Sequence, residues 1–183
     1  MADKQQLLSL LNAGDYDTLN TELLELHSAY ARGQVDESVL ETAFLTFAHA
    51  APETTTGLDR WISTYPDMFV PFLSRSVHRW HIAMLIKGSR SIDALDDGQR
   101  ASFDQLLSSA NSDLFSAIER RPRLGIAYAW LIHIATVRGH RNDIEDLLNV
   151  GARSDPTSAV IHRRYLESLR PWMPGNPHTC LLY

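Results

Sequence analysis

Two histidines in the middle of the chain are the first candidates for chemistry. His78 and His81 lie three residues apart, so a helix would place both imidazoles on one face, where they could provide two ligands to a metal ion. A metal site needs further ligands, and the surrounding helical segment has no Asp, Glu or Cys to supply them. We therefore expect that the two histidines bind no metal and that they lie on the surface or face a partner. A metal-binding or enzymatic protein that uses His78 and His81 is the alternative interpretation.

His133 is a weaker candidate for a general base. It follows Trp130 on the same predicted helix, where an interior histidine with satisfied hydrogen bonds is the common case. The sequence also lacks a Gly-rich phosphate loop, a Gly-x-Ser-x-Gly nucleophile turn and a His-Glu-x-x-His zinc motif. We expect no catalytic residue and no cofactor.

Acidic residues gather before Gly98, at Asp93, Asp96 and Asp97. A calcium-binding loop of this kind requires carboxylates at fixed alternate positions and a distant bidentate Glu, and neither is present. The segment 89–99 is polar and rich in turn-forming residues, so we interpret it as a solvated connection.

Arginines form two clusters. The first contains Arg120, Arg121 and Arg123, and the second contains Arg163, Arg164 and Arg170. The first cluster suits the end of a helix, where cations interact favourably with the helix dipole. The second could receive an acidic partner, although an exposed helix face is the simpler interpretation.

The composition is that of a soluble globular protein. Of the 183 residues, 44% are hydrophobic and 21% are charged, and this length suits one domain with a real core. A net charge of −5 argues against a nucleic-acid surface. The single cysteine excludes an internal disulfide, and no apolar run suits a signal peptide or a membrane span. We expect a cytoplasmic protein that has neither a nucleic acid nor a membrane as its partner.

Apolar residues recur at spacings of three and four along most of the chain, which predicts helices. The expected helices cover residues 3–13, 16–32, 36–47, 58–65, 69–87, 100–120, two helices within 118–156, and 157–169. No stretch alternates as a strand does. The prediction is an all-α fold of about eight or nine helices in antiparallel hairpins. One domain would cover 1–171, followed by an irregular tail over 172–183.

Local signals predict three further boundaries. Residues 54–57, Thr-Thr-Thr-Gly, indicate a loop before a short helix. Asn111 and Ser112 could divide the helix predicted over 100–120 into two shorter helices. Asp155 would cap the last helix, with Pro156 at its first position.

Residues 118–156 have the pattern of a helix hairpin bracketed by prolines. Pro122 and Pro156 are 34 residues apart, the period of a tetratricopeptide repeat. Leu131 and Gly139 suit their consensus positions, and Tyr128 stands where the consensus has Trp. The residues that depart are Ile132, Ile144 and Gly151. We predict one divergent unit in a tetratricopeptide-like, right-handed helical array. The expected aromatic anchors of the helix pairs are Trp61, Trp80, Trp130 and Trp172.

An ordered series of segments resembles one protein family. The segments are GDYDTLNTELLELHSAYARG (14–33), DESVLETAFLTF (36–47), LDRWISTYPDMF (58–69), AYAWLIHIATVRG (127–139) and SDPTSAVIHRRYLESLRP (154–171). Between Asp15 and Trp172 the chain resembles the bacterial family called domain of unknown function 4034. The resemblance implies a tetratricopeptide-like helical fold and a bacterial origin, and it implies no catalytic residues.

The end of the chain departs from that family. Similar proteins continue after Trp172 with a Trp-Gly-Gly-Ser-like segment and more helices, whereas this chain has RPWMPGNPHTCLLY. Cys180–Tyr183 is what one frame of a common transposase sequencing adapter encodes, so we expect a truncated gene. The apolar side of the helix over 157–169 would then belong to an interrupted core.

The architecture predicts binding rather than a reaction. Stacked helix hairpins leave a concave face for a peptide or a helix of another protein. The residues that we expect to face such a partner are Tyr128, His133, Arg138 and Arg163. We predict a protein-protein interaction scaffold, and an immunity-type protein that neutralises a toxin is a further alternative.

Overall fold

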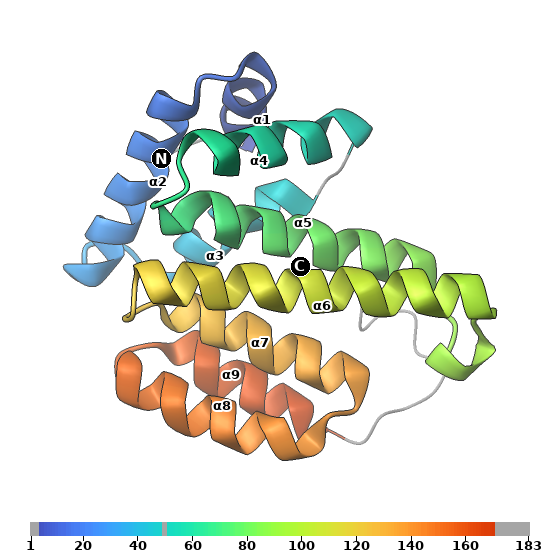
Figure 1. The fold of residues 1–183 in the computed structure, drawn as a ribbon. Coiled ribbons are helices and arrows are strands. Elements are labelled where there is room, and N and C mark those ends of the chain that lie inside the picture. The colour runs from blue at the N-terminus through green and yellow to red at the C-terminus, as the bar shows by residue number, and fades with distance from the viewer. Residues whose placement is uncertain (1–3, 49–50, 171–183) are drawn as a thin grey trace.

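The computed structural model describes residues 4–48 and 51–170 of the chain (Figure 1). These residues form nine α-helices and two short 3-10 helices and contain no strand, which confirms the all-α prediction. The α-helices are α1 (Lys4–Ala13), α2 (Tyr16–Ala31), α3 (Glu37–Leu45), α4 (Pro52–Thr64), α5 (Phe69–Lys87), α6 (Asp97–Arg120), α7 (Gly125–Arg138), α8 (Arg141–Ser154) and α9 (Ala159–Ser168). The 3-10 helices are η1 (Thr46–Ala48) and η2 (Ile92–Ala94). The predicted tail over 172–183, with Trp172 and the segment Cys180–Tyr183, lies outside the described residues.

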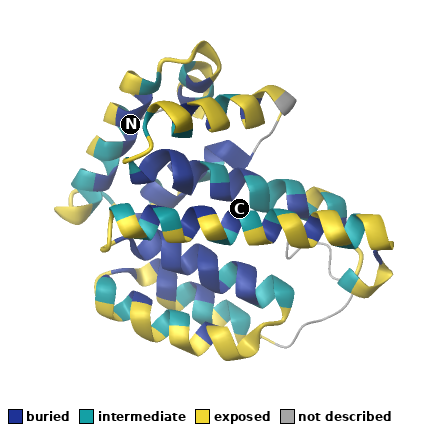
Figure 2. Cartoon of the chain, in the orientation of Figure 1, coloured by how far each residue is buried: buried dark blue, intermediate teal, exposed yellow. Residues whose placement is uncertain are grey.

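The helices are arranged around a long central pair. Figure 1 shows α5 and α6 side by side across the middle, with α1, α2 and α4 on one side and α7, α8 and α9 on the other. In Figure 2 the most deeply buried stretches are the first half of α5 and most of α7, whereas α4, α6 and α8 carry exposed residues on their outer faces. Burial is therefore greatest in the two helices that have neighbours on several sides.

α5 is the helix on which most others pack. It contacts α2, α3, η1, α4, α6 and α7. Its bounds coincide with the predicted helix over 69–87, because Pro71 suits a first turn and Gly88 suits a helix end. Gly88 has a φ of 57°, which any other residue except Asn or Asp would rarely adopt.

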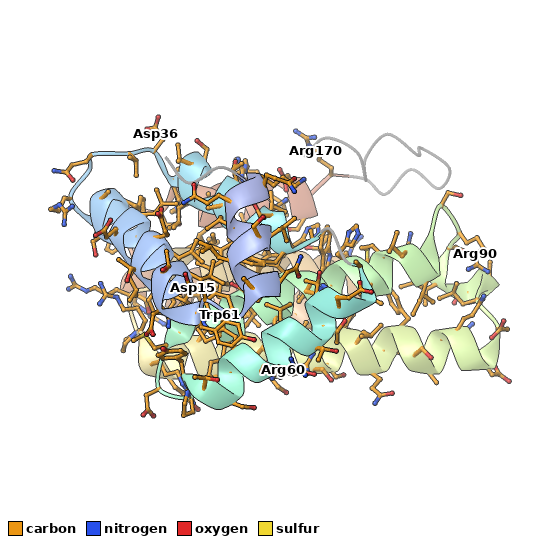
Figure 3. All side chains as sticks on the ribbon, turned by 90° about the horizontal axis from the view of Figure 1, so that it is seen from above. Asp15, Asp36, Arg60, Trp61, Arg90 and Arg170 are labelled. Atoms are coloured by element: carbon orange, nitrogen blue, oxygen red, sulfur yellow. The ribbon has the colours of Figure 1, made fainter. Side chains whose placement is uncertain are left out.

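Trp61 anchors the N-terminal helices. Its side chain is fully buried, stacks on Tyr16 at a centroid distance of 6.2 Å and lies 5.9 Å from the Phe47 ring. Its indole N–H donates to Asn20 Oδ1 over 3.1 Å, so the one polar atom of the ring has a partner. Figure 3 labels Trp61 where α4 meets α1 and α2, next to the exposed Arg60.

Residues 54–57 are helical, so the predicted loop is wrong. α4 begins at Pro52, six residues before the predicted start at 58. Thr54 is buried, and Gly57 lies so close to α1 that a Cβ atom would be 3.2 Å from Leu11 Cγ. The packing of α1 on this turn holds it helical against the local preference of the threonines and the glycine.

Asn111 and Ser112 do not divide α6, which runs without a break from Asp97 to Arg120. The Ser112 hydroxyl donates to the Ser108 carbonyl, four residues earlier in the same helix, over 3.2 Å. This hydrogen bond is compatible with a continuous helix. The helix also begins earlier than predicted, because Asp96 and Gln99 form a capping box. The segment 89–99 is thus a structured helix start rather than a solvated connection throughout.

α9 begins at Ala159, with Ser158 rather than Asp155 as its N-cap. The Asp155 carboxylate accepts hydrogen bonds from the Thr157 hydroxyl (2.8 Å) and the Tyr30 hydroxyl (3.3 Å). Because both Asp155 oxygens have side-chain partners, Ser158 caps the helix and accepts from the Ile161 amide over 3.4 Å.

The apolar side of α9 packs within the described part of the protein. Val160 and Ile161 are buried, and α9 contacts both α7 and α8. These two residues of the predicted interrupted core therefore have packing partners among the described residues. Leu166 and Leu169, nearer the end of the helix, remain exposed.

Two glutamates on α3 bind α9 from more than a hundred residues away. Glu37 accepts from the Ser158 hydroxyl (2.6 Å) and from the Val160 amide (2.9 Å) at the start of α9. Glu41, one turn later, pairs with Arg164 over 2.8 Å. All four side chains are buried, so each charge depends on its partner for compensation. We call this set, Glu37, Glu41, Ser158, Val160 and Arg164, the α3–α9 clasp.

α7 and α8 are in close contact at Gly151. A Cβ atom there would lie 2.8 Å from Tyr128 Cβ, a distance that forces one helix to move. We predict that Gly151→Ala lowers the free energy of unfolding by about 1–3 kcal/mol through overpacking. Gly98→Ala is the matched control, because its Cβ would meet nothing closer than 3.4 Å and alanine favours a helix. Urea unfolding of both variants checks this, and equal midpoints would contradict it.

Candidate functional site

The four residues predicted to face a partner occupy different environments. Tyr128 is buried and lies between α7 and α8, against the glycine at position 151. It belongs to the hydrophobic core, and 7% of its surface is exposed. Tyr128 therefore stabilises the helix hairpin and is not presented to a partner.

His133 lies in an aromatic cluster between α5 and α7. Its ring centroid is 5.2 Å from that of Trp80 and 5.7 Å from that of Trp130, and the two indoles are 4.9 Å apart. Burial and, to a smaller extent, the nearby Arg164 cation lower the pKa of His133 from 6.5 to about 3. The imidazole is therefore neutral at physiological pH and packs between the two indoles while the residue remains partly exposed.

Arg163 is engaged within the protein. It pairs with Glu41 of α3, and its neighbour Arg164 pairs with the same carboxylate and with Glu167 over 3.0 Å. The Arg164 guanidinium also lies 5.6 Å from the Trp130 ring centroid. The interpretation of this cluster as an exposed helix face is wrong for Arg164, which is 4% exposed.

Arg138 is the candidate that borders a surface hollow. It ends α7, and its guanidinium donates to the Asp104 carbonyl (2.8 Å) and the Ser108 hydroxyl (2.7 Å) of α6. The hollow lies between α6, α7 and α8 and has a volume of about 270 Å³. We call it the α6–α8 groove.

The residues that line the α6–α8 groove are of two kinds. We call the apolar ones the floor: Phe115 of α6, Leu131 and Ala135 of α7, and Leu147 of α8. We call the polar ones the rim: Asn111, Arg138, His140, Asp143 and Asp146. Phe115 is 51% exposed, which is unusual for a phenyl ring in a chain whose other five phenylalanines are each at most 8% exposed. The groove thus combines exposed apolar surface with groups able to fix an orientation.

His78 is held inside the protein by neighbouring groups, so the expectation of a surface or partner-facing histidine is wrong for it. His78 is buried, and its two ring nitrogens lie 2.8 Å from the Thr55 hydroxyl and 3.3 Å from the Phe47 carbonyl. Burial lowers its pKa, so the neutral ring is the stable form. Across residues 4–48 and 51–170, no three His, Cys, Asp or Glu side chains are placed together to hold a metal ion. His78 connects α5 to α4 and η1.

Arg120, in the other arginine cluster, covers apolar surface. Its guanidinium lies 4.1 Å from the Phe72 ring centroid and donates to the Ser116 carbonyl over 2.7 Å. Arg121 and Arg123 are exposed beyond the end of α6. The predicted interaction of Arg120 with the end of its helix is thus combined with a cation–π contact to α5.

An ion-pair cluster between α5 and α6 was not predicted. The buried Asp113 receives two hydrogen bonds from Arg75, at 2.7 and 3.0 Å, and one from Arg79 at 2.7 Å. Arg75 also pairs with the exposed Asp59 of α4 over 2.8 Å. One signal was available in the sequence, because Asp113 falls at helical spacing from Ala110 and Ala117 on the apolar stripe of its helix.

Asp113 and Asp59 provide a matched pair for mutation. We predict that Asp113→Asn lowers the free energy of unfolding by about 2–4 kcal/mol, because two arginines lose a buried counter-ion. Asp59→Asn should cost below about 1 kcal/mol, because that carboxylate is half exposed to water. Urea denaturation at pH 7 distinguishes the two, and an equal cost would show that Asp113 is not the centre of the cluster.

The pKa of His133 predicts a loss of stability in acid. The folded protein keeps this ring neutral down to about pH 3, whereas the unfolded chain protonates it near 6.5. Stability from this residue is therefore present above pH 6.5 and is lost as the pH falls from 6.5 towards 3. Relative to His133→Gln, the wild type should lose about 3 kcal/mol more between pH 7 and pH 4. An NMR titration of the His133 ring with a midpoint near 6.5 would contradict this.

No family model, no curated protein and no solved structure matches the chain. In the part of the chain that the structure describes, no helix combines the length and the apolarity needed to cross a membrane. The functional assignment therefore rests on the geometry of the α6–α8 groove and its surroundings.

Proposed function

We propose that this protein is a protein-interaction scaffold that receives a short segment of another protein in the α6–α8 groove. The observation that carries the proposal is the half-exposed Phe115 ring beside a hollow floored by the buried Leu131 and Ala135. Exposed apolar surface next to a concavity is typical of sites that bind other molecules. A volume of about 270 Å³ suits a few side chains of a peptide better than a large cofactor.

The packing of the C-terminal helices supports a tetratricopeptide-like arrangement as part of this proposal. α7 and α8 form a hairpin whose turn is Gly139, at a φ of 75°, and α9 packs on both helices. That order, a hairpin followed by the first helix of a next unit, is the one expected of a helical repeat. The resemblance to domain of unknown function 4034 agrees with such a fold and supplies no reaction.

The alternative built on His78 and His81 receives less support. Both His78 nitrogens lie near protein groups, so a metal or substrate would have to displace the Thr55 hydroxyl or the Phe47 carbonyl. The α6–α8 groove requires no such displacement, because its Phe115 ring is already exposed. Binding of a protein segment is therefore the function that the geometry supports best.

Selection of a random-peptide display library on the purified chain tests the proposal. We expect enriched peptides whose affinity falls at least about ten-fold for Phe115→Glu, because the new carboxylate would face an apolar side chain of the ligand. Leu166→Glu is the matched control, since Leu166 is 63% exposed on α9 and does not line the groove.

Two results would contradict the proposal. One is a selection that enriches no peptide. The other is a set of enriched peptides that bind Phe115→Glu as tightly as the wild type. For the comparison of variants, circular dichroism must show that Phe115→Glu and Leu166→Glu keep the helical fold. We expect this because both side chains are exposed.

A further inference from the structure

We infer, on the basis of the proposed function, that the segment bound in the α6–α8 groove is cationic: an apolar side chain enters the floor and an adjacent Lys or Arg reaches the acidic side of the rim. The inference rests on charge complementarity between the rim and its occupant. The carboxylates in question are Asp143 and Asp146 of α8.

The two carboxylates share one face of α8. They are three residues apart and both border the hollow, with Leu147 of the floor beside them. The Asp143 side chain is 64% exposed, and its ionic partner is His140, at 3.6 Å. In the described part of the chain, Asp146 makes no hydrogen bond or ion pair. The acidic side of the rim therefore holds negative charge that the protein itself compensates little.

The cation on the opposite wall does not neutralise these acids. Arg138 donates to the Asp104 carbonyl and the Ser108 hydroxyl of α6, and it pairs with neither Asp143 nor Asp146 among the described residues. Its guanidinium is thus directed to α6. The Arg138 charge therefore makes no direct contact with the two carboxylates.

A further acceptor at the groove has no partner. Asn111 Oδ1 is buried and makes no hydrogen bond within residues 4–48 and 51–170, and Asn111 lines the hollow. An unpartnered buried acceptor is costly unless a donor completes it. The α6–α8 groove thus contains a polar atom that the described protein leaves without a hydrogen-bond donor.

An acidic occupant fits poorly. It would place its carboxylates next to Asp143 and Asp146 in a partly desolvated groove, and like charges in contact disfavour binding. A second copy of this chain is also a poor match on overall charge, because two molecules of net charge −5 repel each other. The groove therefore selects a basic and apolar segment of a different protein.

The test compares charge-neutralised variants with the peptides enriched by display. Asp143→Asn combined with Asp146→Asn removes two negative charges from the rim. Glu145→Gln combined with Asp67→Asn is the matched control, because it removes the same charge at two exposed positions that do not line the groove. Fluorescence anisotropy measures the affinity of each fluorescein-labelled peptide for the wild type and both double variants.

We expect the enriched peptides to carry Lys or Arg beside an apolar residue. Their affinity should fall about ten-fold for the rim variant, change little for the control, and weaken with added sodium chloride. Peptides that are uncharged or acidic, or an equal loss in both double variants, would overturn the cationic occupant while leaving a peptide-binding groove.

Two other outcomes would contradict either the groove itself or the choice of its occupant. Peptides that bind but ignore Phe115→Glu would overturn the groove itself, and with it this inference. Self-association of the chain in sedimentation velocity, abolished by Phe115→Glu, would identify a second copy as the occupant and overturn the basic partner. Replacing Lys and Arg by Gln in an enriched peptide provides the reciprocal measurement, with the same expected loss of about ten-fold.

Discussion

The buried clasp between α3 and α9 is the constraint on which the C-terminal half depends. Glu37 satisfies the start of α9 through the Ser158 hydroxyl and the Val160 amide, and Glu41 compensates the buried Arg164. A buried ion pair adds little net stability compared with an apolar pair of the same shape, but removal of one partner leaves an uncompensated charge. The clasp therefore specifies where α9 sits more than it stabilises the fold. Because α7 packs on α9, the same contact fixes one side of the hairpin that forms the α6–α8 groove.

The walls of the α6–α8 groove are each held by a separate contact. α6 is fixed to α5 by Asp113, α7 is fixed to α6 by Arg138, and α8 meets α7 at Gly151 without space for a side chain. Rigid walls lower the entropic cost of binding, because few groups have to be ordered when a ligand arrives. Phe115 lies on α6, the helix that the first two contacts hold, so a rotation of the helix that buried its ring would have to break the hydrogen bonds of Asp113 and Arg138.

Helices that are defined by local signals could be predicted from the sequence, and contacts between distant helices could not. The helix over 69–87 was predicted with its observed bounds because proline and glycine mark both ends. Residues 54–57 were misassigned because the packing of α1 outweighs the local preference of threonine and glycine. Tyr128 was expected at a partner surface because periodicity places a residue on a helix face without showing what covers that face. Arg163 was also expected at a partner surface, but it pairs with Glu41, which lies 122 residues earlier in the chain. The α6–α8 groove was not predicted, and Arg138 is the residue of its lining that was expected to face a partner. Phe115 was missed because its apolar spacing is like that of core residues.

The α3–α9 clasp also has a consequence for the order of folding. Its hydrogen bonds join residues 121 and 123 positions apart, so a loop of most of the described chain must close before they form. Hairpins such as α5–α6 and α7–α8 need only short loops and form from contacts close in sequence. During synthesis on the ribosome, Glu37 and Glu41 therefore emerge long before the residues of α9 that they bind, and both carboxylates remain without these partners until α9 has been made.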